Sequence, residues 1–271
     1  MARTVLDALQ SLLPDSSKTT LRQLLANDRV RVNGAPERDA KRELAEDEHV
    51  SVAAKHEKLD ARVKILFEDS DLIVIDKAAG LRTVPDDKIR HETAETFLST
   101  FINGQAHHVH RLDRDTSGVL VFAKNTFTRD RLQEQFADHK PDRVYVVIVH
   151  GKLRESSGTF RSHLAEDRDM KVRSVTEGGK EAITHYRVVA SGKRWSMVEA
   201  TLETGRRNQI RVHFAEAGHP VVGDTMYGHG REDGFGRLAL HAKTLSLVHP
   251  RSGEKMTFTA EIPKAFREAK L

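Results

Sequence analysis

The sequence of 271 residues predicts an α+β protein, and three observations support this fold class. Hydrophobic residues make up 38% of the chain and charged residues 31%, which is enough apolar material for a sizeable core. Strand-length apolar runs recur along the chain, whereas stretches with helical spacing are few. These runs are also not separated by regular helices, as the strands of a doubly wound parallel sheet would be.

The first fifty residues predict a small module of two helices packed on a sheet. Residues 5–13 place apolar side chains on one helical face, and a second helix begins after the serines at 16–17, either of which can cap it. Polar and apolar residues alternate at 29–32 and at 48–52, as in half-buried strands. The dipeptide Asn33-Gly34 that follows the first of these strands predicts a tight hairpin turn.

A charged segment at 55–62 is the predicted linker between this module, at 1–54, and a second domain at 63–271. Apolar runs predict strands in the second domain at 65–67, 72–75, 119–122, 144–149, 182–189, 197–202, 238–247 and 256–262. Capping residues predict that helices begin at Thr93, at Asn125-Thr126 and at about Arg207, the last of them ending at Gly218.

The composition excludes several kinds of site. The chain has no cysteine, so disulfides, cysteine-ligated zinc or iron–sulfur sites and a cysteine nucleophile are all excluded. The first residues lack the apolar run and cleavage site of a signal peptide, and no stretch approaches the roughly 18 apolar residues that span a bilayer. A cytoplasmic protein without a membrane partner is therefore expected. The net charge of +4 is compatible with a polyanionic partner but does not require one.

One short polar segment, at 110–118, has the position of an active-site loop. It reads His-Arg-Leu-Asp-Arg-Asp-Thr-Ser-Gly and comes directly before the buried strand predicted at 119–122. A rigid sheet can hold a reactive side chain at such a boundary between loop and strand. The same residues also fit a solvated turn, because Asp, Ser and Gly are common in turns. The residues alone leave both interpretations open.

This segment resembles the signature His-Arg-Leu-Asp-x-x-Thr-Ser-Gly of RluA-type pseudouridine synthases, which convert uridine into pseudouridine in ribosomal or transfer RNA. Further stretches are similar to family motifs and come in the expected order: Asp-Lys-Ala-Ala-Gly-Leu at 76–81, Arg-Val-Tyr-Val-Val-Ile-Val-His-Gly at 143–151, Leu-Glu-Thr-Gly-Arg-Arg-Asn-Gln-Ile-Arg-Val-His at 202–213, Gly-Asp-Thr-Met-Tyr-Gly at 223–228 and Leu-His-Ala at 240–242. Two departures stand out: the stretch at 76–81 lacks the family's proline, and Asn208 stands where many members have histidine.

The resemblance covers most of residues 62–262 and implies a mixed, mostly antiparallel sheet with flanking helices and a central cleft. It implies that Asp113 is the catalytic aspartate and that Arg211 pairs with it, since a guanidinium favours the charged carboxylate. Tyr145 would stack on the uracil, and its hydroxyl is a candidate for the late proton transfer at C5. Leu240 would close the apolar side of the pocket.

The resemblance also implies that the target nucleotide is flipped out of the RNA. Arg111 matches the family arginine that enters the vacated stack, which suits a planar guanidinium. Lys77, Arg206 and Arg207 are candidate phosphate contacts near the cleft, although each also fits a solvated surface charge. Because uridine and pseudouridine are isomers, the resemblance implies no metal, no redox cofactor and no other small-molecule cofactor.

The segment at 4–53 resembles the S4 RNA-binding module, which often precedes this kind of catalytic domain. The resemblance would make the second helix and the following strand the RNA-facing surface. Residues 1–53 contain eight Lys and Arg against nine Asp and Glu, so a basic face there must be local. The side chains expected to face RNA are Lys18, Arg22, Arg29 and Arg31.

Three other functions compete with this interpretation. The histidines at 107, 108 and 110 would suit a zinc hydrolase, but the helical His-Glu-x-x-His spacing is absent. A catalytically silent S4-type RNA-binding or ribosome-assembly factor would have no need of Asp113, Tyr145 and Arg211 together. A base-excising glycosylase would also flip a nucleotide and use a carboxylate, and it would release free uracil.

Overall fold

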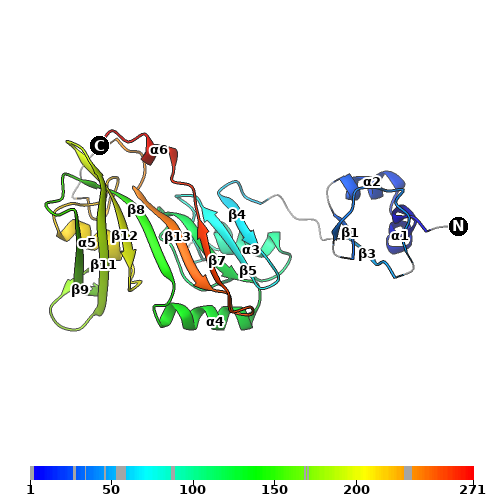
Figure 1. The fold of residues 1–271 in the computed structure, drawn as a ribbon, viewed down its shortest axis with the longest axis horizontal. Helices are drawn as coiled ribbons and strands as arrows, with labels where there is room; N and C mark the ends of the chain where they lie inside the picture. The colour runs from blue at the N-terminus through cyan, green and yellow to red at the C-terminus, as the bar shows by residue number, and fades with distance from the viewer. Residues whose placement is uncertain are drawn as a thin grey trace. The chain divides into compact units, whose positions relative to one another are not determined.

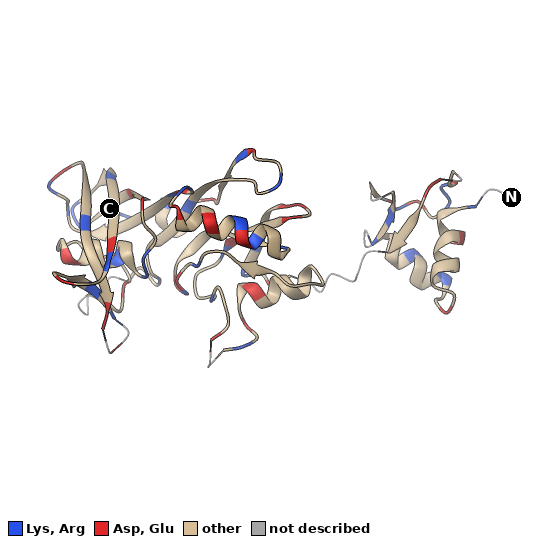
Figure 2. Ribbon diagram, turned by 90° about the horizontal axis from the view of Figure 1, so that it is seen from below, with Lys and Arg blue, Asp and Glu red and all other residues tan. Residues whose placement is uncertain are grey.

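The computed structural model describes residues 3–26, 29–33, 35–45, 47–52, 59–86, 89–167, 169, 171–228 and 234–271. The chain divides into two compact units, Met1–Lys58 and Leu59–Leu271, which are described one at a time (Figure 1). Lys and Arg are mixed with Asp and Glu along the ribbon of both units (Figure 2). No helix within these described ranges is long and apolar enough to cross a membrane.

The first unit contains the two helices and the small sheet that the sequence predicts. Its elements are α1 (Val5–Leu12), α2 (Lys18–Ala26), β1 (Val30–Val32), β2 (Ala35–Pro36) and β3 (Val50–Val52), with strand order β2-β1-β3. Thr4 and Asp7 form a capping box at α1, and the Ser17 hydroxyl accepts a hydrogen bond from the Thr20 N–H at α2. Gly34 of the predicted turn lies outside the described residues. The core consists of Val5, Leu9, Leu21, Leu24, Leu25, Val30 and Val32.

The second unit is built on one large sheet. In chain order its strands are β4 (Val63–Glu68), β5 (Leu72–Lys77), β6 (His107–His108), β7 (Ser117–Ala123), β8 (Asp142–His150), β9 (Ser157–Glu166), β10 (Val172–Val175), β11 (Lys180–Ser191), β12 (Trp195–Leu202), β13 (Leu240–Val248) and β14 (Lys255–Thr259). The strand order is β10-β9-β11-β12-β8-β13-β7-β5-β4, while β14 pairs with β13 and β6 with β7. Only the β13–β7 pairing is parallel among the pairings described, which confirms the mixed, mostly antiparallel α+β sheet.

Helices pack on both faces of this sheet. They are α3 (Ala94–Phe101), α4 (Thr126–Ala137), α5 (Gln209–Glu216) and the short α6 (Lys264–Arg267). Strands β5 and β7 have alternate residues in two different cores, so their continuous apolar runs are buried on both faces. One core includes Leu98 of α3 and Phe214 of α5, and the other includes Leu132 of α4. The predicted starts at Thr93 and Asn125 and the predicted end at Gly218, which has φ +83°, are confirmed.

The structure differs from the sequence prediction in several places, and the short elements β6 and α6 were also not predicted. Strands β9 and β10 were not predicted, because most residues of β9 alternate between exposed and half-buried and no apolar run marks it. Helix α5 begins at Gln209 rather than at Arg207, because Asn208 adopts a left-handed conformation with φ +55°. The second unit also begins within the predicted linker: Leu59 packs against its core, whereas residues 55–58 lie outside the described part of the chain.

The parallel pairing of β13 with β7 requires a glycine at the end of the 110–118 segment. Ala242 pairs with Gly118 of β7 on one side and with Tyr145 of β8 on the other. Gly118 has φ +116°, and a Cβ at this position would overlap the backbone of Ala242. The Thr-Ser-Gly end of the segment is therefore the point at which two strands meet, rather than a solvated turn.

Candidate active site

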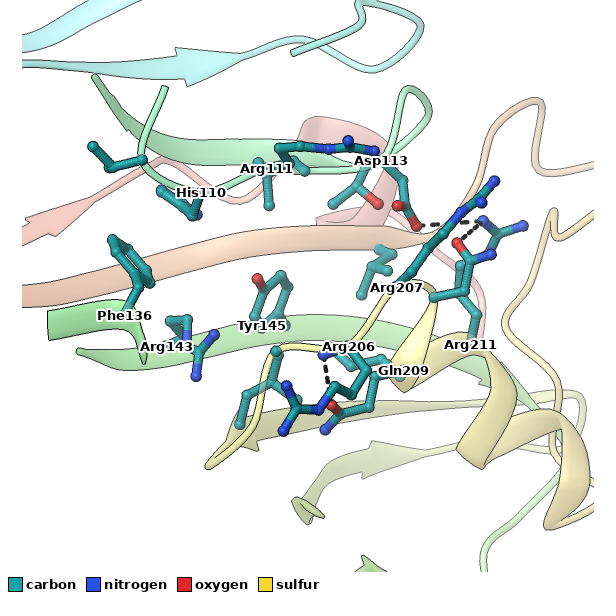
Figure 3. A pocket seen from close by; sticks show the side chains of 18 of the residues that line it. His110, Arg111, Asp113, Phe136, Arg143, Tyr145, Arg206, Arg207, Gln209 and Arg211 are labelled. Atoms are coloured by element: carbon teal, nitrogen blue, oxygen red, sulfur yellow. Dashed lines mark hydrogen bonds and ion pairs between the residues drawn. The ribbon is translucent and has the colours of Figure 1, made fainter. Parts of the chain in front are cut away.

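A cleft of about 890 Å³ opens in the second unit, and it collects most of the residues that the sequence analysis selected. Asp113 and Arg111 come from the segment that precedes β7, Tyr145 from β8 and Arg211 from α5 (Figure 3). Leu240, at the start of β13, and Arg206 also line this cleft. The predicted central cleft is thus present, and it brings together side chains that are far apart in the sequence.

Arg211 lies between two carboxylates. Its Nε and Nη2 donate to the two oxygens of Asp224 at 2.7 and 2.8 Å, and its Nη1 lies 3.4 Å from Oδ2 of Asp113. Burial alone would lower the pKa of Arg211, but the hydrogen bonds and charge of Asp224, followed by those of Asp113, raise it above its ordinary value. The guanidinium is therefore charged at any working pH. It is held chiefly by Asp224, which leaves Asp113 in a single long contact on the cleft side.

Asp224 is the anchor of this arrangement. Its side chain is fully buried, whereas that of Asp113 is 31% exposed. Besides the bidentate pair with Arg211, Asp224 accepts hydrogen bonds from the backbone N–H groups of Met226 and Tyr227. A buried carboxylate with four such bonds is a fixed support. Asp113, which is partly exposed to the cleft, is the carboxylate that a substrate can reach.

The segment that carries Asp113 is fastened by residues from the 76–81 motif and the loop after it. The Thr83 hydroxyl donates to the carbonyl of Leu112 at 2.8 Å and accepts from its N–H at 3.2 Å. The backbone N–H of Gly80 donates to the carbonyl of Arg114. Because the backbone is held on both sides of Asp113, its carboxylate is positioned before any substrate binds.

Lys77 is not in the cleft, and the expected phosphate contact is replaced by an internal role. The residue is 0% exposed, and its Nζ donates to the carbonyls of Ala78, Leu81 and Arg114 at 3.0, 2.7 and 3.1 Å. All three ammonium donors are thus used inside the protein. Burial lowers the pKa of Lys77 to about 7, although the nearby charges of Asp113 and Asp115 oppose this.

This burial predicts that stability depends on pH. In the unfolded chain the pKa of a lysine is about 10.4, so between pH 7 and pH 10 the unfolded state binds more protons at Lys77 than the folded state does. The free energy of unfolding should therefore rise by about 2 kcal/mol between pH 7.5 and 9.5 on account of this residue. Urea unfolding at the two pH values measures the rise, and Lys77→Met should remove it. An equal rise in the variant would mean that Lys77 does not titrate in this way.

Tyr145 lies in the middle of the cleft floor (Figure 3). Burial raises its pKa, and the charge of Arg143 opposes that shift. Beyond it, the ring of His110 stacks on Phe136 with centroids 4.5 Å apart. Burial lowers the pKa of His110 to about 3, and its Nε2 accepts a hydrogen bond from the N–H of Val121, so this histidine is neutral. Three ring-bearing side chains, Tyr145, His110 and Phe136, therefore line this part of the cleft.

The loop that carries Arg206 is held by a buried amide. The Gln209 side chain accepts from the Thr204 hydroxyl and from the Arg206 N–H, and it donates to the carbonyl of Ile183 and the hydroxyl of Thr184. All four hydrogen-bonding positions of this amide are thus occupied. Arg207, in contrast, is exposed and pairs with Glu166 of β9.

Asn208, where the family pattern has histidine, connects two parts of the site. Its Oδ1 accepts from Nη1 of Arg211 at 3.0 Å, and its Nδ2 donates to the Tyr227 hydroxyl at 3.2 Å. The left-handed backbone that ends the loop here is one that asparagine tolerates better than most residues. The departure from the pattern therefore leaves Arg211 supported.

Two of the three clustered histidines have other partners. Nδ1 of His108 lies 2.6 Å from Glu95, and His110 is occupied as described above. In the described ranges, the one group with metal-ligating geometry is Asp69, Asp71 and His249, which lies elsewhere. Within that group Asp71 already binds Arg251 through both oxygens, and His249 lies 3.0 Å from Asp69.

Comparison with known proteins identifies the family. A family model described as RNA pseudouridylate synthase matches residues 71–216, more than half of the chain. The chain belongs to this family. It is 41% identical over 229 residues to the uncharacterized RNA pseudouridine synthase YhcT of Bacillus subtilis, covering 82% of this chain and 74% of that protein. It is 34% identical over 291 residues to the ribosomal large subunit pseudouridine synthase D of Zymomonas mobilis, covering 95% and 89% of the two chains.

A solved structure agrees with this assignment. The human RNA pseudouridylate synthase domain containing 1 aligns with a TM-score of 0.63 and 27% identity, covering 73% of this chain and 83% of that one. The protein is therefore an RNA pseudouridine synthase, an isomerase that converts uridine to pseudouridine. A catalytically silent RNA-binding factor is not favoured by these relatives.

Sequence reasoning missed two of the charged residues that line or support the site. Asp224 lies in the Gly-Asp-Thr-Met-Tyr-Gly stretch, and an acidic residue beside a glycine turn was the available signal for it. Arg143 lies two residues before Tyr145 on β8, so the alternation of a strand places both on the same face. Neither signal reveals which side chains these residues contact. Asp224 and Arg211, for example, come together only in the folded chain.

Proposed function

We propose that the protein isomerises a uridine of structured ribosomal RNA by flipping the nucleotide into the cleft, with Asp113 as the catalytic carboxylate. The observation that carries this proposal is that Asp113, Tyr145 and Arg211 line one cleft, with Arg211 in contact with Asp113 and anchored on the buried Asp224. Ribosomal RNA is proposed rather than transfer RNA, because relatives that cover most of this chain are named ribosomal large subunit pseudouridine synthase D. With this substrate, we also propose that the protein acts in the cytoplasm.

The chemistry breaks the bond between N1 and C1′, turns the uracil and joins C5 to C1′. Asp113 would supply the ionised carboxylate that attacks or stabilises the sugar or the base, as carboxylates do in glycoside chemistry. Arg211 would keep that carboxylate oriented through its contact with Oδ2. The uracil would stack on Tyr145, whose hydroxyl is suited to the proton transfer at C5, with Leu240 closing the apolar side.

Access to the cleft requires that the uridine leave its stack in the RNA. Arg111 is exposed at the cleft and would fill the vacated space. Arg206 and Arg207 would contact phosphates, Arg207 after exchanging its partner Glu166 for RNA. The product and substrate have the same atoms, so the proposal includes no cofactor.

Turnover without added cofactor tests this function. Purified protein incubated with chelator and with ribosomal RNA from its own cell, transcribed without modifications, should form pseudouridine at one or a few positions. Pseudouridine is detected by mapping the RNA, and total RNA from cells with and without the gene gives the site. Release of free uracil would indicate a glycosylase, and modification confined to transfer RNA would overturn the proposed substrate.

We further propose that the first unit binds RNA as an S4-like module, through Lys18, Arg22, Arg29 and Arg31. Lys18 and Arg22 are exposed on α2, and Arg29 and Arg31 are half-buried beside and on β1. The unit has its own core, separate from that of the second unit. Four basic residues on consecutive elements give RNA phosphates a surface to contact despite the local charge of −1.

Deleting residues 1–55 should therefore weaken binding to large structured RNA and lower its salt dependence, because several phosphate contacts are lost. The second unit should stay folded, since its core contains no residue of the first. Filter binding across a series of salt concentrations measures both effects, and circular dichroism checks the fold. Unchanged affinity and salt dependence would exclude the RNA-binding role of this unit.

A further inference from the structure

Arg143 is a buried cation at the cleft without an acidic partner. It is 7% exposed, and the structure gives it one hydrogen bond, from Nη2 to the carbonyl of Glu203 at 3.1 Å. Its Nε is buried with no hydrogen-bond partner among the described residues. Of the charges that act on it, Arg206 is a second cation, and within the described ranges no carboxylate pairs with it. Burying a guanidinium in this way is costly unless an anion joins it.

The surroundings of Arg143 hold its guanidinium in place on the cleft side. The group lies 5.9 Å from the ring centroid of Phe136, and a Cβ at position 205 would collide with Nη1, so Gly205 leaves the space it needs. In Figure 3, Arg143 and Phe136 lie on one side of Tyr145, and Asp113 and Arg211 lie on the other. A uridine that stacks on Tyr145 therefore lies between Asp113 and Arg143, so a phosphate that reaches Arg143 belongs to a neighbouring nucleotide of the strand.

We propose that Arg143 is a substrate-binding residue whose guanidinium binds a phosphate group of the RNA next to the flipped uridine. A neutral carbonyl, such as a uracil oxygen, would add to what Glu203 already supplies and would leave the charge uncompensated. A phosphate oxygen neutralises it and accepts hydrogen bonds from a planar guanidinium. Arg211 differs in this respect, because Asp224 already neutralises it inside the protein.

This inference rests on the proposed function in one respect, namely that RNA occupies the cleft. The test measures binding of the full chain to a single-stranded oligouridylate of about ten nucleotides over a range of salt concentrations. Arg143→Gln should lower the affinity about tenfold and reduce the slope of log K against log salt by about 0.7, the value for one phosphate contact on a single strand. Arg143→Lys keeps the charge and should keep the slope. Arg161→Gln is the matched control, since Arg161 is exposed on β9, pairs with Glu181 and does not line the cleft.

Two further measurements separate a binding role from a structural one. Arg143→Met removes a buried unpaired charge, so its melting temperature should equal or exceed that of the wild type while its salt slope falls. An unchanged slope in folded Arg143→Gln and Arg143→Met would overturn the assignment. An abasic oligonucleotide should show the same loss, and a loss seen only with bases present would mean that the contact is to uracil and would also overturn it. If the wild-type protein bound RNA normally but formed no pseudouridine, that result would instead count against the proposed function.

Discussion

Asp113→Asn should abolish pseudouridine formation while leaving RNA binding almost unchanged. An amide cannot supply the negative charge that the glycosidic rearrangement requires, and we expect the single-turnover rate to fall about 10⁴-fold, as it does when one member of a catalytic set is removed. Stability should change by less than about 1 kcal/mol, because the residue is partly exposed and its one contact with Arg211 is long.

The measurement is a single-turnover assay on the mapped ribosomal site, with RNA binding followed in parallel. Asp115→Asn is a matched control, since Asp115 belongs to the same segment but pairs with Arg114 and does not line the cleft. Equal turnover by Asp113→Asn and the wild type would remove the central assignment.

Substitutions of Arg111 and Arg211 should slow the reaction in different ways on paired and unpaired substrates, although the two residues carry the same charge. Arg111→Ala should slow the reaction about tenfold or more when the uridine is paired in a duplex, and much less when the uridine is already unpaired in a loop. Flipping breaks base stacking in the duplex but not in the loop, and the Arg111 side chain replaces that stacking, which is worth about 1–3 kcal/mol per base. Arg211→Lys should instead be slower by about 10²–10³-fold on both substrates, because the orientation of Asp113 is lost in either case.

Lysine is chosen at position 211 because alanine would leave Asp224 buried without its cationic partner, at a cost of about 3–5 kcal/mol in stability. Single-turnover rates on duplex and loop versions of one target decide the question, and thermal melting confirms that both variants are folded. The same dependence on substrate in both variants would mean that at least one arginine has been given the wrong role.

Local signals in the sequence were enough to predict much of the fold. The caps at Thr93 and Asn125 act within a few residues, and the buried runs of β5 and β7 are apolar throughout. The proposed catalytic residues could also be selected from the sequence, since the 110–118 segment and the stretches around Tyr145 and Arg211 match a known pattern. The fold then brings them into one cleft.

What the sequence could not reveal was burial and pairing across long distances. Lys77 has the appearance of a surface cation, yet three carbonyls from two separate segments enclose it. Asp224 lies 13 positions from Arg211 in sequence, and only the turn at Met226 and Tyr227 shows why this acid is the partner. Strand β9 lacks a buried face over most of its length, so no periodicity marks it.

The parallel pairing of β13 with β7 has a consequence for how activity is lost. In the hydrogen-bonded order of the sheet, this pairing is the junction between a half that holds the Asp113 segment and a half that holds Tyr145 and Arg211. Its register consists of two residue pairs, His241 with Ser117 and Ala242 with Gly118. Partial opening at this junction would separate the reacting groups while both halves kept their own strands paired. Inactivation by heat or denaturant should therefore precede the loss of secondary structure, and recovery of activity should be the last event of refolding.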